Sequence, residues 1–281
     1  MSEIKFTKMQ GAGNDYVYIN LFETEIPDPV TLAQKISHRR YGVGSDGLIL
    51  IAPSQIADVQ MIMYNYDGSQ SEMCGNGIRC VGKYVWDHQL VDKKTLTVET
   101  GAGVLSLDLI TNSNNKVESV RVSMGIPELK GLNIPSTIDQ DSVINYQFDF
   151  ADFKLKGTLV SMGNPHFVTY VDDVKNTPVE SWGPIIENSD FFPNRVNIEF
   201  VQVVSKKEVI QRTWERGAGE TWACGTGASA VCVAGVLNQK NKASVLIHLT
   251  GGDLNLNWDG PGTSVIKEGP AVEVYPGYWE L

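Results

Sequence analysis

The sequence has little that would suit a nucleic acid, a membrane or a metal ion. Lysine and arginine number 23 against 33 aspartates and glutamates, a formal net charge of -10, whereas nucleic-acid binding needs a basic surface. No window reaches the roughly 18 apolar residues of a membrane-spanning helix, and no apolar signal segment follows Met1 to Lys5. The four histidines are scattered. We therefore expect a cytoplasmic enzyme without a metal site.

The chain is also poor in cysteine, with four in 281 residues. Cys74 and Cys80 are six residues apart, Cys224 and Cys232 are eight apart, and no C-x-x-C occurs. These spacings do not suggest a zinc site, and thiols in the cytoplasm are expected to be reduced. Because Cys80 and Cys232 fall at apolar positions inside predicted helices, we interpret them as core residues.

The sequence does contain an internal repeat. The two halves correspond at an offset of 150 residues, the interval from Cys74 to Cys224. Several polar positions share this offset, which predicts two domains of similar topology whose equivalent loops converge on one cleft. The corresponding segments are Met73-Cys74-Gly75-Asn76-Gly77 with Ala223-Cys224-Gly225-Thr226-Gly227, Gly13-Asn14 with Gly163-Asn164, Asn65 with Glu215, and Gly47 with Asn197.

The pattern of apolar residues predicts mainly short strands. Helices are expected over 30–37, 77–88 and 227–240. The last of these is apolar on nearly every side, so protein must surround it, as a curved sheet would. A Gly and Pro cluster near 124–127 marks the expected domain boundary. The expected strands are 4–8, 16–21, 48–52, 59–65, 95–100, 104–109 and 119–124 in the first half, and 146–150, 156–160, 166–171, 196–204, 209–215 and 244–248 in the second.

Cys74 and Cys224 each end an extended run and begin a helix through a glycine-rich turn. Free backbone N–H groups at a helix N-terminus stabilise a thiolate and also bind a carboxylate. Inverting the α-carbon of an amino acid needs a base on one face and an acid on the other. We therefore interpret the two cysteines as catalytic residues of an epimerisation, one starting as thiolate and the other as thiol. No lysine setting for pyridoxal phosphate (PLP) is evident, so no cofactor is expected.

Other polar residues near the two turns are candidates for holding a substrate. Asn14 and Asn164 lie in equivalent Gly-Asn loops, with a simple turn asparagine as the alternative. His166 could tune a nearby thiol, or could be a core histidine bonded to backbone. The adjacent Glu215 and Arg216 could hold an ammonium and a carboxylate, or could form a surface ion pair.

These motifs together resemble the diaminopimelate epimerase family over almost the whole chain. The resemblance implies an α+β fold of two similar domains, each a β-barrel-like curved sheet around a central helix, related by pseudo-two-fold symmetry. The domains would be 1–122, completed by a C-terminal strand at 270–281, and 123–269. The motifs are Phe6-x-Lys8-Met9-x-Gly11-x-Gly13-Asn14-Asp15, Tyr64-Asn65-x-Asp67-Gly68-Ser69-x-Ser71-x-Met73-Cys74-Gly75-Asn76-Gly77-x-Arg79, Gly163-Asn164-Pro165-His166, Arg195-x-Asn197, and Trp214 to Gly217 through Ala223 to Gly227.

The family resemblance also implies an activity and a partner. The activity is interconversion of LL- and meso-2,6-diaminopimelate without PLP, in lysine biosynthesis, by a cytoplasmic homodimer that binds neither nucleic acid nor membrane. Cys74 and Cys224 resemble the proton donor and acceptor, and His166 and Glu215 resemble residues that tune the two thiols. The substrate-binding residues that the resemblance implies are Asn14, Asn65, Gly75, Asn76, Asn164, Asn197, Glu215, Arg216, Gly225 and Thr226.

Three alternatives remain open at this stage. Proline racemase and hydroxyproline epimerase share the chemistry, but typically carry His where this chain has Asn76. A cysteine hydrolase would need only one of the two cysteines, with His166 as its base. A non-catalytic binding protein would need neither thiol. One departure from the family pattern is Gly47, where many members carry Gln.

Overall fold

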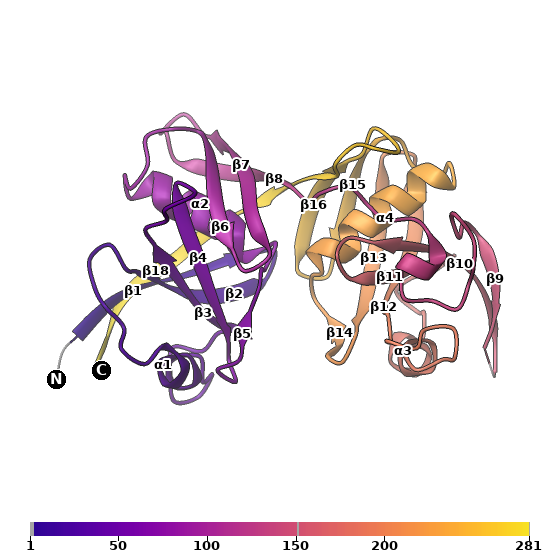
Figure 1. The fold of residues 1–281 in the computed structure, drawn as a ribbon, viewed down its shortest axis with the longest axis horizontal. Coiled ribbons are helices and arrows are strands. Elements are labelled where there is room, and N and C mark those ends of the chain that lie inside the picture. The colour runs from indigo at the N-terminus through magenta and orange to yellow at the C-terminus, as the bar shows by residue number, and fades with distance from the viewer. Residues whose placement is uncertain (1–2, 151, 281) are drawn as a thin grey trace. The chain divides into compact units, whose positions relative to one another are not determined.

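The computed structural model describes residues 3–150 and 152–280, which form two compact units (Figure 1). The first unit contains the residues up to 122 and those from 268 onward, and the second contains residues 123–267. Residues 1, 2 and 281 of the expected first domain, and residue 151 of the expected second, lie outside the described residues.

The first unit is a sheet that curves around one helix. In the order β18-β1-β2-β3-β4-β6-β7-β8 each strand pairs with the next, and only β2–β3 and β4–β6 are parallel. Its elements are β1 (Glu3–Gly11), β2 (Asn14–Asn20), α1 (Pro29–Ile36), β3 (Gly47–Ala52), β4 (Val59–Asn65), β5 (Gln70–Ser71), α2 (Gly77–Asp87), β6 (Thr95–Thr100), β7 (Gly103–Thr111), β8 (Val117–Ser123) and β18 (Val272–Glu280).

The second unit repeats this topology. The order is β9-β10-β11-β12-β13-β15-β16, with β11–β12 and β13–β15 parallel. The register repeats too, because Tyr16 pairs with Gly47 in the first unit and His166 pairs with Asn197 in the second. Its elements are η1 (Gly131–Asn133), β9 (Tyr146–Asp149), β10 (Lys154–Ser161), β11 (Pro165–Tyr170), α3 (Val179–Glu187), β12 (Asn197–Ser205), β13 (Glu208–Glu215), β14 (Gly219–Thr221), α4 (Gly225–Leu237), β15 (Ser244–Leu249), β16 (Gly252–Asn257) and β17 (Ile266–Pro270), which crosses the boundary at 267.

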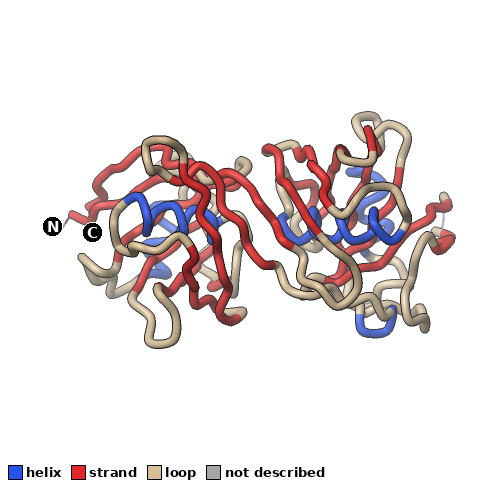
Figure 2. The backbone as a smooth tube through the Cα atoms, turned by 90° about the horizontal axis from the view of Figure 1, so that it is seen from above, coloured by secondary structure: helices blue, strands red, loops and turns tan. Residues whose placement is uncertain are grey.

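Each unit has a central helix enclosed by strands, as Figure 2 shows. In α4 every residue from Gly227 to Gly235 is buried, and the helix shares a core cluster with the fully buried Trp258. Each Val that such a helix removes from water stabilises the fold by about 1.5–3 kcal/mol. The apolar composition of α4 is therefore the composition that its position requires, and the expected α+β fold class is confirmed.

The structure also contains a helix that the sequence analysis missed. Helix α3 contains Gly183 and Pro184, two residue types that usually interrupt helices. It forms because Gly183 packs against the indole of Trp214, where a Cβ would lie 2.3 Å from Cδ2. The expected helix 227–240 begins at Gly225 and ends at Leu237. Strands β5, β14, β16 and β17 were also not expected; β5 and β14 have only two and three residues.

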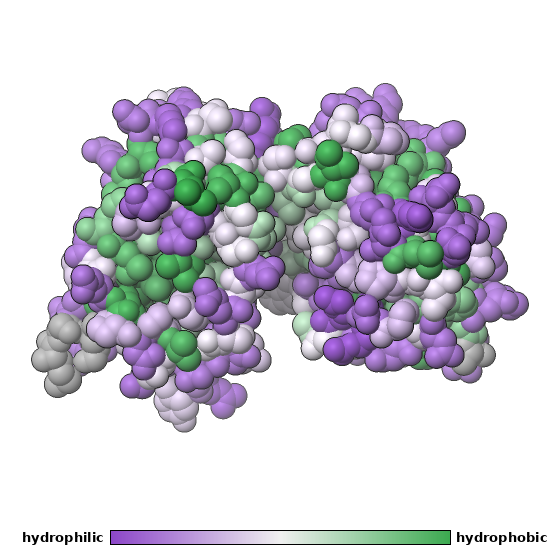
Figure 3. All heavy atoms as spheres, viewed as in Figure 1, coloured by the Kyte–Doolittle hydropathy of each residue, from purple (hydrophilic) through white to green (hydrophobic). Residues whose placement is uncertain are grey.

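The outer surface gives no sign of a membrane segment. Within the described ranges, none of the helices combines the length and the apolar character needed to cross a bilayer. On the face drawn in Figure 3, hydrophilic residues cover most of the second unit, and hydrophobic residues appear among them in small groups.

Candidate active site

Cys74 lies in the turn between β5 and the start of α2. Its sulfur accepts a hydrogen bond from the backbone N–H of Gly77 at 3.3 Å and donates to Asn14 Oδ1 at 3.1 Å. The thiol is half-buried. The sulfur therefore takes the place that a capping hydroxyl commonly takes at a helix N-terminus.

Cys224 occupies the equivalent turn and is the N-cap residue of α4. The N–H of Gly227 donates to its sulfur at 3.4 Å, and Thr226 Oγ1 lies 3.5 Å away. The other two thiols, Cys80 and Cys232, are fully buried within α2 and α4 rather than at the helix starts. Burial raises the pKa of Cys80 to about 11 and the pKa of Cys232 to about 12, as expected for core residues.

A charged network supports the Asn14 side of the first site. Asn14 Nδ2 donates to Asp46 at 2.6 Å, and Arg39 joins Asp46 to Asp15 with contacts of 2.8 Å each. Lys8 also pairs with Asp15 at 2.5 Å. Burial acts to raise the pKa of Asp15, but the hydrogen bonds and charges of Arg39 and Lys8 outweigh it and lower that pKa. Sequence reasoning gave Arg39 and Asp46 no role, because neither stands near a cysteine in the chain.

Arg79 is fully buried beneath the Cys74 turn. Its guanidinium donates to Gly75 O at 3.0 Å, to Asn76 Oδ1 at 3.0 Å and to Pro270 O at 3.1 Å. The Asn76 side chain is thus bonded inside the protein, and the groups that this turn offers a substrate are backbone amides. Arg79 belongs to the quoted motif, but its role in holding the turn was not foreseen.

Gly47 and Asn65 are both constrained by neighbouring residues. A Cβ at Gly47 would lie 2.1 Å from Tyr64 O, so position 47 accepts a side chain only if β3 and β4 move. Asn65 Nδ2 donates to Ser69 Oγ at 2.9 Å, which folds the amide back onto its own turn. Glycine at position 47 is therefore required by this local packing.

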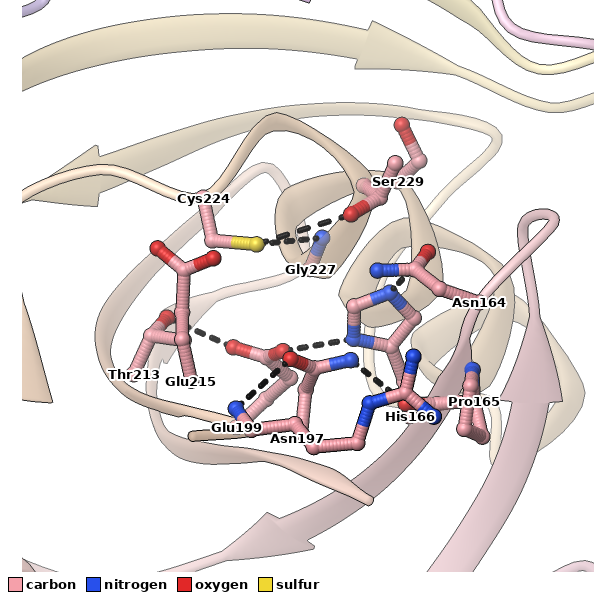
Figure 4. Close-up of polar contacts among 12 residues, drawn as sticks. Asn164, Pro165, His166, Asn197, Glu199, Thr213, Glu215, Cys224, Gly227 and Ser229 are labelled. Carbon is pink, nitrogen blue, oxygen red and sulfur yellow. Dashed lines mark hydrogen bonds and ion pairs between the residues drawn. The ribbon is translucent and has the colours of Figure 1, made fainter. Parts of the chain in front are cut away.

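The second unit contains a network of buried polar side chains (Figure 4). Glu199 lies fully buried on β12, with its Oε1 2.8 Å from His166 Nδ1. Its Oε2 accepts from Gln211 Nε2 at 2.7 Å and from Thr213 Oγ1 at 2.6 Å. Sequence reasoning missed Glu199, although it is a lone acidic residue in the otherwise apolar run from 198 to 201.

This network extends to the loops that carry the expected substrate-binding residues. His166 Nε2 lies 3.0 Å from Asn164 Oδ1. Asn197 donates to Pro165 O at 2.8 Å and accepts from the N–H of Arg216 at 3.0 Å. The Asn197 amide thus joins the two loops, and both of its polar ends are used within the protein.

The Glu215 carboxyl lies beside the Cys224 thiol, as Figure 4 shows, and accepts from Thr221 Oγ1 at 2.5 Å. Burial, together with the Glu199 charge, raises the pKa of Glu215. Burial, Glu215 and Glu199, in that order, raise the pKa of Cys224 well above its usual value. Arg216 is exposed and donates to the backbone instead, and within the described part of the chain no ion pair joins it to Glu215.

Each unit therefore gathers its own expected site residues. Asn14, Gly75 and Asn76 lie around Cys74 in the first unit, and the side chain of Asn65 bonds Ser69. The second unit brings its set together around the N-terminus of α4; the members are Asn164, His166, Asn197, Glu215, Arg216, Cys224, Gly225 and Thr226. Among the residues described, no group of three or more His, Cys, Asp or Glu side chains could hold a metal ion.

Solved structures show how widely this fold occurs. A phenazine biosynthesis protein of the PhzF family from Bacillus anthracis superposes with a TM-score of 0.71 at 16% identity, covering 100% of both chains. A hydroxyproline epimerase from Agrobacterium vitis superposes with a TM-score of 0.66 at 14% identity, covering 98% of this chain and 92% of that one. At these identities the likeness concerns the fold alone.

Sequence comparison is more specific. The family model described as diaminopimelate epimerase matches residues 6–130 and 158–274. The diaminopimelate epimerase of Leptospira biflexa is 53% identical over 280 residues, covering 99% of this chain and 100% of that protein. The enzyme of the same name from Methanococcus maripaludis is 46% identical over 274 residues, covering 98% and 99%. This chain is a member of the diaminopimelate epimerase family.

Proposed function

We propose that this chain interconverts LL- and meso-2,6-diaminopimelate with Cys74 and Cys224 as its two acid–base groups. One observation carries the proposal. In both units a cysteine ends the turn before the central helix, and its sulfur accepts the N–H of the residue three positions later, Gly77 or Gly227. Two such thiols meet the requirement for one proton carrier on each face of an α-carbon.

Two protons are transferred in each turnover, one on each face of the α-carbon. A thiolate takes the α-proton from one face, and the thiol of the other cysteine gives its proton to the opposite face. The negative charge that develops on the substrate is stabilised by donors around its carboxylate. The N–H groups of Gly75 and Asn76, just before α2, and of Gly225 and Thr226, in the first turn of α4, are the donors we assign, because amides at a helix start lack partners within the helix.

The remaining expected residues hold the zwitterionic ends of the substrate. Arg216 is exposed and can take the remote carboxylate in a bidentate contact. Asn14, Asn65, Asn164 and Asn197 are assigned to the polar groups of the substrate, with Asn197 acting mainly by joining two loops. His166 and Glu215 tune the thiols. No step requires PLP or another cofactor, since the amides supply the charge stabilisation.

We further propose a cytoplasmic homodimer acting in lysine biosynthesis. The four cysteines are free, which suits a reducing compartment. Strand β18 leaves Val272, Val274, Tyr275 and Tyr278 between 41% and 69% exposed, and such an apolar strip is typical of a surface that meets a second copy. Light scattering on the purified protein measures this state, and a monomer at all concentrations would exclude the dimer.

The decisive assay follows LL-diaminopimelate in heavy water without added PLP or metal. Deuterium should appear at the α-carbon of the product, and Cys74→Ala and Cys224→Ala should each lower kcat/KM by at least about 100-fold, since an acid–base group contributes about 10²–10⁴-fold to the rate. Cys80→Ala, at a fully buried thiol, is the matched control and should remain active. Substantial epimerisation by either catalytic variant would contradict the two-cysteine mechanism.

The same assay separates the alternatives. A proline racemase would epimerise proline and ignore diaminopimelate. A cysteine hydrolase would tolerate the loss of one of the two cysteines and would not place deuterium on a recovered substrate.

A further inference from the structure

The two cysteine turns are alike in their backbones but differ in what lies beneath them. At the offset of 150 residues, Ile49 of β3 corresponds to Glu199 of β12, and Met61 of β4 corresponds to Gln211 of β13. The strand registers agree, because Ile49 pairs with Met63 and Glu199 pairs with Thr213. Where the first unit has apolar side chains, the second unit therefore has a buried carboxylate with its hydrogen-bond donors.

The contacts of two glycines show that Ile49 and Glu199 each lie against the first turn of the central helix. A Cβ at Gly77 would lie 2.7 Å from Ile49 Cδ1, whereas a Cβ at Gly227 would lie 2.4 Å from Glu199 Oε1. Gly227 is also the residue whose N–H bonds the sulfur of Cys224. The Glu199 carboxylate is thus in contact with Gly227 in the first turn of α4, the residue whose N–H bonds the Cys224 sulfur.

Hydrogen-bond donors surround the Glu199 carboxylate. It is fully buried and accepts hydrogen bonds from Gln211, Thr213 and His166, at 2.6–2.8 Å. A buried carboxylate without such donors would cost several kcal/mol. The N-terminus of α4 adds a favourable field for this negative charge.

That arrangement has a consequence for the thiol above it. The positive end of α4 already faces one carboxylate, so a second negative charge on the Cys224 sulfur is disfavoured. The groups that face Cys224 are His166 from β11, Glu199 from β12, Glu215 from β13 and Thr226 from α4, and two of them are carboxyls. The raised pKa of Cys224, caused first by burial and then by Glu215 and Glu199, agrees with this reasoning.

We propose that Glu199 is a positioning residue that keeps the Cys224 sulfur protonated in the resting enzyme, so that Cys224 is the first proton donor. The inference rests on the proposed two-cysteine function. In the first turnover Cys74, whose S–H donates to Asn14 Oδ1 in the free protein, loses that proton to water; the resulting thiolate takes the α-proton, and the S–H of Cys224 gives its proton to the opposite face. Cys74 is then the thiol and Cys224 the thiolate, and exchange of one proton with water restores the resting form.

Thiol reactivity tests this without substrate. Iodoacetamide reacts with the thiolate, so at pH 8 the alkylation rate of Cys224 reports its ionised fraction, and mass spectrometry of peptides follows each cysteine separately. Glu199→Gln should accelerate alkylation of Cys224 at least tenfold, the effect of one pKa unit, and leave Cys74 within twofold. Glu187→Gln is the matched control, because Glu187 is also buried in this unit but bonds Trp214 and Gly217 instead.

Two further measurements keep the result interpretable. Hydrogen exchange of α4 amides checks that the variant has not simply opened the site. Glu199→Asp, which withdraws the charge by one methylene, should shift Cys224 in the same direction by a smaller factor, and it replaces Glu199→Gln if that variant does not fold. An unchanged Cys224 rate in a folded variant, or an equal acceleration of both cysteines, overturns the proposal. Neither outcome depends on epimerase activity, so failure of the proposed function would be seen separately.

Discussion

Arg79 offers a quantitative test of how the Cys74 turn is held. The side chain is fully buried at the N-terminal turn of α2 and donates to Gly75 O, Asn76 Oδ1 and Pro270 O. Arg79→Met keeps most of the volume and removes all three bonds. Burial lowers the pKa of Arg79, which shows that the site opposes the charge that it holds.

The expected cost follows from two opposed effects. Each acceptor left without a donor in the interior costs about 1–3 kcal/mol, so three acceptors cost several kcal/mol. Removing a buried cation returns part of this, because its desolvation penalty disappears. We expect a net loss of about 2–4 kcal/mol in the local stability of α2.

Hydrogen exchange measured by mass spectrometry reads this locally. Peptides from α2 should exchange about 30- to 700-fold faster in Arg79→Met, since about 1.4 kcal/mol corresponds to a factor of ten. Peptides from α4 in the other unit are an internal control and should not change. Arg121→Met is the matched variant, because Arg121 is half exposed and pairs with Glu268 alone, which is worth below about 1 kcal/mol. Normal α2 protection in Arg79→Met, or equal loss in α2 and α4, would refute the reasoning.

Two more outcomes are expected. Gly227→Ala should cut kcat/KM at least 100-fold, since its Cβ would lie 2.4 Å from Glu199 Oε1 and must displace it; steady-state kinetics near wild type would contradict this packing. His248 lies 2.8 Å from Asp253 and 2.8 Å from Glu208, and the hydrogen bond to Asp253, with that to Glu208, raises its pKa against a smaller opposing effect of burial. This stabilisation is fully present below the unfolded value of about 6.5 and is lost as pH rises through the folded pKa. His248→Ala should therefore lower the free energy of unfolding in urea by less than about 1 kcal/mol at pH 5.5, and by a smaller amount at pH 9. A larger loss at pH 9 than at pH 5.5 would contradict the raised pKa of His248.

Much of the fold could be predicted because its signals are local and repeated. The offset found from the two cysteine turns also relates α1 at Pro29 to α3 at Val179. The same offset would have predicted α3, but it was applied only to the polar motifs. The close contact of Gly183 with Trp214, a residue distant in sequence, could not be predicted from local pattern.

The site was harder to predict wherever a residue's role depends on burial. The motif positions indicated that His166 and Asn197 belong to the site. They did not indicate that the side-chain amide of Asn197 would use its N–H and its oxygen to join two loops. Glu199 gave only the weak signal of an acid within an apolar strand. Its importance arises from the helix that lies above it and from donors on β13, which are contacts that no local pattern contains.

The way the chain returns to its first unit sets an order of events during synthesis. The second unit is one continuous stretch, 123–267, whereas the first needs β18, whose register runs from Glu3 opposite Glu280 to Gln10 opposite Val272. On the ribosome, β1 can pair with β2 early, but its other edge must wait for residues 272–280, while the second unit can already pack its core. The unit begun first is thus completed last, and in that interval one edge of β1 stays open to a chaperone or a neighbouring nascent chain.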